Sequence, residues 1–193
     1  RAPETIDMED KSQLIADAVN HAPAGLVESI TDTDALGPSI EKAVAAGIPV
    51  ISMNSGSDVS KKLGAVLHVG QDEFDAGKAA GERLASMGGT KGLCVNHEVG
   101  NVALDLRCAG FEEGFGGPVT VLPTTNDPTE IGAKVQAALD SDGDIDTVMA
   151  LGASLAGEPS VEAVQKMGMG DSVRVASFDL SASFQEAVAA GNA

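Results

Sequence analysis

The 193-residue sequence contains no tryptophan, no tyrosine and only five phenylalanines. Any core must therefore be aliphatic, and the 43% of residues that are hydrophobic are enough to build one. The length suits one large domain or two small ones. The 23 glycines fit many tight turns between strands and helices.

Positive charge is also scarce, since 12 Lys and Arg stand against 29 Asp and Glu, for a net charge of −17. Nucleic acid and anionic membrane surfaces are not expected as partners of these residues, because both demand a positively charged footprint. No apolar run of about 18 residues occurs, so no segment is expected to insert in a membrane. The histidines have no clustered ligand side chains and no phosphate-binding lysine follows a glycine loop, so we expect neither a metal nor a cofactor.

Short apolar segments alternate with segments of helical period along most of the chain. The predicted strands cover residues 25–30, 49–53, 65–69, 92–96, 119–123, 147–151 and 173–178. This alternation predicts an α/β fold with parallel sheets, right-handed crossovers and helices on both faces of each sheet. The connection 54–64 is polar, glycine-rich and too short for a crossover helix. Such a break is typical of a sheet edge or a domain crossover, so we place a domain boundary near residues 70–72.

Ligands of open α/β sheets bind beyond the carboxyl ends of the strands, so the residues after each strand are the candidates for a site. These positions hold three amides, a hydroxyl, an imidazole and one acid, namely Asn54, Ser55, His97, Asn101, Asn126 and Asp179. The set lacks a nucleophile paired with a general base. We therefore expect a binding protein and not an enzyme.

Asp179 has two interpretations at its strand-to-helix junction. It can cap the helix that follows, or it can accept hydrogen bonds from ligand hydroxyls, and Ser181 could cap the helix in its place. Arg107 is either a solvated charge or a partner of Asp105. His97 is more typical of a satisfied polar residue than of a catalytic base.

The two cysteines, Cys94 and Cys108, are expected to lie close together. Cys94 falls about three residues before the end of its strand, and Cys108 about seven residues into the next helix. The rises per residue place both at a depth of about 10 Å, one on the sheet and one on the helix above it. A disulfide requires Cα atoms within about 7 Å, and the alternative is two buried thiols that act as small apolar residues.

Four segments, "AVAAGIPVISMNSGSD", "HVGQDEFDAGKAAGERL", "RCAGFEEGF" and "VRVASFDLSASFQEAVAAG", resemble type I periplasmic sugar-binding proteins of ABC importers, the ribose-binding-protein-like group. The resemblance runs over nearly the whole chain. It implies two Rossmann-like lobes that capture a monosaccharide or polyol between them, in the periplasm. It also implies a monomer whose partners are the membrane subunits of the importer, which receive the ligand.

The resemblance implies further strands before and after this sequence, so that the fold is incomplete at both ends. Residues 1–71 would be part of the N-terminal lobe. Residues 72–193 would be the C-terminal lobe, with the chain ending near a second crossover. The effector domain of a LacI-type transcriptional repressor shares this fold and is the alternative function.

Site residues follow from the resemblance one position at a time. Arg107 matches the family arginine of an "RxxGF" helix, and Asp179 matches the family aspartate at a "GFD" strand end. Asn126 falls near a loop position where the family has an aromatic residue. A carboxylate can accept two hydroxyl hydrogen bonds, so Asp179 is expected to read a vicinal diol, with Arg107 compensating its buried charge.

The sequence departs from the family at two strand ends. Asn54 and Ser55 stand where the family often has Asp-Arg, so Asn54 would offer both a donor and an acceptor. Gly152 and Ala153 replace a frequent Asn-Asp pair, so that ligand contact is lost or supplied by another residue.

Overall fold

The structure is a computed structural model that describes residues 7–193. The chain divides into two compact units. The first unit runs through Glu73 and also includes Gly100–Ala103, and the second comprises Phe74–Val99 and Leu104–Ala193. This division falls two residues after the boundary placed by the sequence. The lobe limits at residues 71 and 72 stay a prediction.

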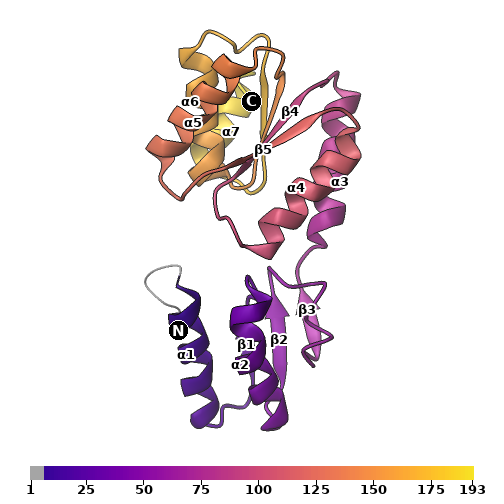
Figure 1. Cartoon of the computed structure of the whole chain (residues 1–193), viewed down its shortest axis with the longest axis vertical. Helices are drawn as coiled ribbons and strands as arrows, with labels where there is room; N and C mark the ends of the chain where they lie inside the picture. Colours follow the sequence, from indigo (N-terminus) through magenta and orange to yellow (C-terminus); the bar gives the residue numbers. More distant parts are fainter. Residues whose placement is uncertain (1–6) are drawn as a thin grey trace. The chain divides into compact units, whose positions relative to one another are not determined.

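The first unit is a three-stranded parallel sheet of order β1-β2-β3, with two helices. Its elements, labelled in Figure 1, are α1 (Met8–Asn20), β1 (Leu26–Glu28), α2 (Thr33–Ala45), β2 (Val50–Met53) and β3 (Leu67–Val69). Asp7 and Asp32 accept hydrogen bonds from backbone N–H groups in the first turns of α1 and α2 and so fix where these helices begin. The connection from β2 to β3 holds turns and no helix, as its composition predicts, and β3 lies at the edge of the sheet.

Only one face of the first sheet is covered within the described residues. Ile15 of α1 and Ile40 of α2 pack on Val50, so both helices lie on the same face. On the other face Val27 is 60% exposed and its neighbour two strands away, Leu67, is 57% exposed. Within residues 7–193, α1 and α2 thus cover one face of this sheet, and the expectation of helices on both faces is not met there.

The second unit is a four-stranded parallel sheet of order β5-β4-β6-β7. Its strands are β4 (Gly92–Asn96), β5 (Val119–Pro123), β6 (Thr147–Ala150) and β7 (Arg174–Ser177). Its helices are α3 (Glu73–Ser86), α4 (Val102–Phe115), α5 (Pro128–Ser141), α6 (Glu158–Lys166) and α7 (Ala182–Ala189), with a π-helical turn η1 (Ala153–Gly157) ahead of α6. All seven strands predicted from the sequence are present, and the α/β class with parallel sheets is confirmed.

Helices cover both faces of this second sheet, as Figure 1 shows, with α3 and α4 on one side and α5, α6 and α7 on the other. The strand period of two residues divides the core accordingly. Leu93 and Val148 belong to the cluster under α5, α6 and α7. Cys94 and Met149, their neighbours in sequence, belong to the cluster that also contains Phe111 of α4. The strands are therefore apolar on both sides, which is typical of a covered parallel sheet.

Glycines let α3 and α4 approach until their backbones touch. A Cβ atom added to Gly77 of α3 would lie 2.2 Å from the carbonyl oxygen of Arg107. A Cβ added to Gly110 or Gly114 of α4 would lie 2.0 Å from the carbonyl oxygen of Phe74 or Lys78, respectively. Real Cβ atoms do not approach so closely, so these positions admit no side chain unless the two helices separate.

We expect Gly110→Ala to destabilise the protein, although alanine favours helix over glycine by about 1 kcal/mol. The added methyl group meets the backbone of α3, and overpacking of this kind costs about 1–3 kcal/mol. Gly132→Ala in α5 is the matched control, because the nearest atom to its new Cβ is 3.6 Å away. Urea unfolding of both variants checks the prediction, and equal stability of the two would contradict the backbone contact.

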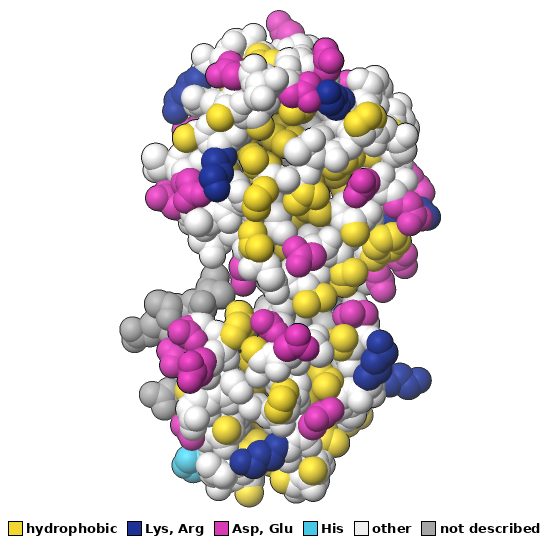
Figure 2. Space-filling view, in the orientation of Figure 1, with side chains coloured by type: hydrophobic (Ala, Val, Ile, Leu, Met, Phe, Trp, Pro, Cys, Tyr) yellow, Lys and Arg dark blue, Asp and Glu magenta, His cyan; other side chains and the backbone are white. Residues whose placement is uncertain are grey.

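Acidic side chains are distributed over the face of the molecule shown in Figure 2, while Lys and Arg are scattered and few. Among residues 7–193, no helix combines the length and the apolar character that crossing a membrane requires.

Candidate functional site

Asp179 follows β7 at the carboxyl end of the second sheet. The preceding Phe178 still donates its N–H to the carbonyl of Ala150, at 3.0 Å, so the strand ladder ends directly before Asp179. The helix N-cap is Ser181, whose hydroxyl accepts from the N–H of Phe184 at 3.1 Å. The interpretation of Asp179 as the cap is therefore wrong, and the prediction that Ser181 takes that role is confirmed.

The backbone of Asp179 has a φ of 64°, in the left-handed region. Aspartate and asparagine tolerate this conformation better than other residues with a side chain. The side chain is exposed, so the expectation of a buried acid whose charge Arg107 compensates is wrong. Its carboxylate is left available for a ligand.

Arg107 lies on α4 and is only 7% exposed, so it is not a solvated charge. Its guanidinium donates from Nη1 to the carbonyl of Leu151, at 3.2 Å, and its Cζ lies 4.6 Å from the centre of the Phe178 ring. Asp105, the other expected partner, accepts instead from Asn96 at 2.7 Å. Arg107 is therefore held beside the ends of β6 and β7, next to the residue that precedes Asp179.

His97 follows β4, and its ring and the carboxylate of Asp179 both lie near Gly152. A Cβ atom placed on Gly152 would lie 3.0 Å from Cε1 of His97 and 3.8 Å from Oδ2 of Asp179. The imidazole is 7% exposed, and burial lowers the pKa of His97. Nearby Glu98 and Asp179 oppose this shift and Arg107 adds to it. His97 is therefore neutral at pH 7, because its ordinary pKa is already about 6.5.

The interpretation of His97 as a satisfied polar residue does not hold. Its Nδ1 is buried and has no hydrogen-bond partner among the described residues. Buried polar atoms in proteins nearly always have a partner, so this nitrogen calls for an explanation.

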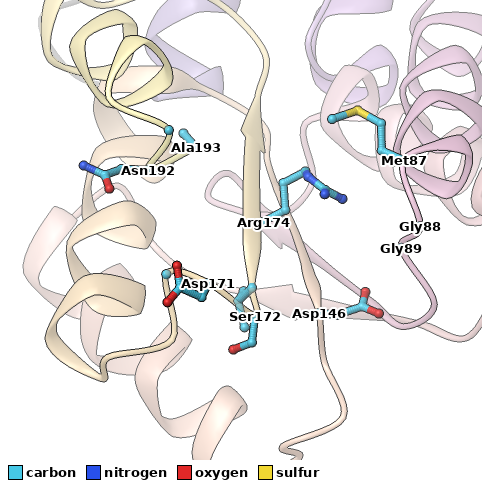
Figure 3. Close-up of a pocket in the computed structure, with 12 residues that line it drawn as sticks. Met87, Gly88, Gly89, Asp146, Asp171, Ser172, Arg174, Asn192 and Ala193 are labelled. Atoms are coloured by element: carbon cyan, nitrogen blue, oxygen red, sulfur yellow. The ribbon is translucent and has the colours of Figure 1, made fainter.

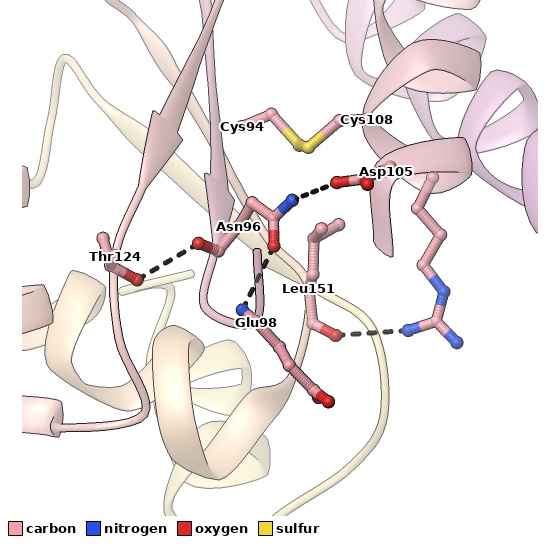
Figure 4. The surroundings of a disulfide bond; sticks show 8 residues. Cys94, Asn96, Glu98, Asp105, Cys108, Thr124 and Leu151 are labelled. Atoms are coloured by element: carbon pink, nitrogen blue, oxygen red, sulfur yellow. Dashed lines mark hydrogen bonds between the residues drawn. A yellow bond between two sulfur atoms is a disulfide. The ribbon is translucent and has the colours of Figure 1, made fainter. Parts of the chain in front are cut away.

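The segment that carries His97 is tied to α4 and to β5, as Figure 4 shows. Asn96 donates from Nδ2 to Asp105, and its Oδ1 accepts from the N–H of Glu98 at 3.1 Å. The carbonyl of Asn96 accepts from the hydroxyl of Thr124 at 3.3 Å. Both neighbours of His97 in sequence are thus fixed, and His97 is positioned between them.

The disulfide adds a covalent link between β4 and α4 (Figure 4). Cys94 of β4 is bonded to Cys108 of α4, with Cα atoms 5.9 Å apart, inside the expected limit. Cys108 directly follows Arg107, so the bond also fixes the helical turn that holds this guanidinium. Neither cysteine is free.

The remaining sequence-predicted residues of the second half do not join this group. Asn126 is exposed and follows β5, which two other strands separate from β7. Asn101 is buried, and its Oδ1 accepts from the N–H of Ala103 at 3.1 Å, so it caps the start of α4. Asn101 also belongs to the first unit of the chain and not to the second.

The first unit presents Asn54 and Ser55 after β2. Asn54 is exposed, has a φ of 61°, and donates its N–H to the carbonyl of Val69 at 3.0 Å. Ser55 is buried, and its carbonyl accepts from Ile30 at 3.1 Å. Sequence reasoning found both Asn54 and Asp179 but missed their shared left-handed conformation, a form of strain that clusters at functional sites.

A pocket of about 300 Å³ at the amino ends of β6 and β7 lies at the opposite end of the second sheet (Figure 3). Asp146 and Arg174 line it. Asp146 accepts hydrogen bonds from the backbone N–H groups of Thr90 and Lys91, so its role there is structural. Within the described residues, no group of three or more His, Cys, Asp or Glu side chains could hold a metal ion.

Comparison with known proteins adds three relatives. The chain is 29% identical to the D-ribose/D-allose-binding protein of Pseudomonas aeruginosa over 188 residues, which cover 90% of this chain and 57% of that protein. It is 37% identical to a carbohydrate transporter of Acidothermus cellulolyticus 11B solved with myo-inositol, with a TM-score of 0.90 over 96% of this chain and 64% of that one. An ABC transporter solute-binding protein of Burkholderia graminis solved with D-arabinose, 19% identical, shares the fold at a TM-score of 0.85, over 100% of this chain and 68% of that one.

The chain thus spans 57% and 64% of the lengths of the first two relatives. The sequence model described as the periplasmic binding protein domain matches residues 2–193. Each of the two units has a parallel sheet, and polar residues follow the ends of its strands. Together with the match to the sequence model, these features show that the chain belongs to the periplasmic binding protein domain family.

Proposed function

We propose that this chain is the ligand-binding part of a non-enzymatic receptor that captures a neutral monosaccharide or polyol and delivers it to the membrane subunits of an ABC importer. The receptor acts in the periplasm as a monomer. Its ligand-binding residues are those that follow the strands, above all Asp179, Arg107 and His97 in the second unit and Asn54 in the first. Ser55, Asn101 and Asn126 support or flank these positions.

One observation carries the proposal: the carboxylate of Asp179 is free of the capping role and stands beside His97 at the carboxyl end of the sheet. A carboxylate accepts two hydroxyl hydrogen bonds, which suits the adjacent hydroxyls of sugars and cyclitols. The relatives bound to myo-inositol and D-arabinose support the same ligand class. The ribose/allose-binding relative favours transport over the repressor alternative.

A thermal-shift screen of the full-length protein tests the function. The probes are myo-inositol, D-ribose, D-allose, D-arabinose and D-fucose. A ligand that binds only the native state adds about 2.7 kcal/mol at a hundred times its Kd, so at least one probe is expected to raise Tm clearly. No shift with any probe would overturn the proposal, and specific binding of duplex DNA would favour the repressor alternative.

A further inference from the structure

Gly152 is a glycine for reasons of space and not of backbone conformation. Its φ of −168° and ψ of 130° are extended, and any residue adopts them. The space that a side chain would need is instead filled by the ring of His97, whose Cε1 and Nε2 lie 3.0 and 3.4 Å from the position of a Cβ. Residue 152 therefore accommodates the imidazole.

The Cβ position of Gly152 also lies near the carboxylate of Asp179. Nε2 of His97 and Oδ2 of Asp179 lie 3.4 and 3.8 Å from the Cβ position of Gly152. Both lengths exceed hydrogen-bond distance, so they show that the two atoms flank Gly152 and not that they bond to a group at that point. A ligand hydroxyl lying between the two atoms would face a nitrogen on one side and a carboxylate oxygen on the other.

The surroundings of the imidazole indicate which ring nitrogen carries the proton. Of the two nitrogens, only Nδ1 is buried without a partner in the described chain. A buried N–H with no acceptor is rarer than a buried acceptor with no donor. This environment favours a neutral ring with its proton on Nε2, the nitrogen 3.4 Å from the Cβ position of Gly152.

We propose that His97, as the Nε2–H tautomer, and Asp179 together bind one hydroxyl of the ligand, and that Gly152 determines specificity by leaving room for this ring. This inference rests on the proposed function. The ligand oxygen accepts from His97 and its proton is donated to Asp179, so the pair selects a hydroxyl over an ether, a carbonyl or a hydrogen atom. Asp179 alone would provide only the acceptor.

Two substitutions of His97 separate the nitrogens. His97→Gln keeps an N–H donor near the position of Nε2, whereas His97→Asn places its donor near Nδ1. The affinities are measured by calorimetry of the full-length protein with myo-inositol, D-ribose and D-arabinose. For His97→Asn we expect the affinity to fall about tenfold, the equivalent of one good hydrogen bond. For His97→Gln we expect an affinity within about threefold of wild type. Equal affinities of the two variants would overturn the proposal.

Gly152→Ala tests the room left for the ring. Its Cβ must push the imidazole aside, so we expect a loss of about tenfold in affinity in the wild-type background and little further loss when His97 is already alanine. Gly143→Ala is the matched control, since no atom lies within 4 Å of its new Cβ. The same loss in both backgrounds would show that Gly152 acts independently of His97 and would overturn its role.

The tautomer is read without any ligand from the imidazole ¹⁵N shifts, with the His97→Gln spectrum assigning the signals. A proton on Nε2 is expected, and a proton on Nδ1 would overturn the proposal. A protein that binds none of the five probes of the thermal-shift screen would instead overturn the proposed function, and the ¹⁵N shifts would still decide the protonation of His97.

Discussion

Asp179→Ala is expected to abolish sugar binding and leave the fold intact. The substitution removes two hydrogen bonds to a charged acceptor, each of which contributes about 1.5–3 kcal/mol, so affinity falls by about a hundredfold or more. Stability changes by about 1 kcal/mol or less, because the side chain is exposed and Ser181 caps the helix that follows. Calorimetry with the probe that gives the largest thermal shift, together with urea unfolding, measures both effects.

Two further variants make the result specific to this carboxylate. Asp179→Asn keeps a residue that tolerates a φ of 64° but removes the charge and one of the two acceptor oxygens, so it separates the role of the carboxylate from backbone strain. Asp171→Ala removes another exposed aspartate, at the opposite end of β7, and is expected to leave affinity unchanged. Unchanged affinity in Asp179→Ala would mean that the ligand binds elsewhere.

Loss of the disulfide is expected to reduce the free energy of unfolding by about 3 kcal/mol, the value for a closed loop of roughly 15 residues. The bond between Cys94 and Cys108 spans 14 positions and lies in the core, since both residues are at most 2% exposed. It stabilises chiefly by restricting the unfolded chain. Urea unfolding with and without a thiol reductant measures the difference.

The double variant Cys94→Ala/Cys108→Ala controls for other effects of the reductant, because its stability should not respond to the thiol. If wild type unfolds at the same urea concentration under both conditions, the two residues act as buried thiols and the cross-link adds nothing. The hydrogen bond between Asn96 and Asp105 joins the same strand and helix, so the reduced protein is expected to fold.

The fold was largely predictable from the sequence, because strand and helix periods are local properties. The positions of all seven strands followed from short apolar runs, and the approach of Cys94 to Cys108 followed from the rise per residue along a strand and a helix. The uncovered face of the first sheet was not predictable. It depends on α1 and α2 packing against each other, which no local pattern specifies.

The candidate site was predictable only in part. The rule that ligands bind at strand ends found Asp179 and His97, and the resemblance added Arg107. The burial of Arg107, the exposure of Asp179 and the partnerless Nδ1 of His97 depend on contacts between distant segments. In the sequence, Gly152 is visible only as a departure from the family. The reason for a glycine there is the ring of His97, which approaches it only in the folded chain.

The pairing of both cysteines, in a sequence without tryptophan or tyrosine, makes these 193 residues a nearly silent background for optical spectroscopy. Within them no free thiol competes with one introduced by mutation, so a single new cysteine would carry a fluorophore at one site only. Leu180 is a suitable position, since it is 79% exposed and directly follows Asp179. A tryptophan at the same position would be the sole indole among these residues. Its emission would report the binding of a ligand near Asp179.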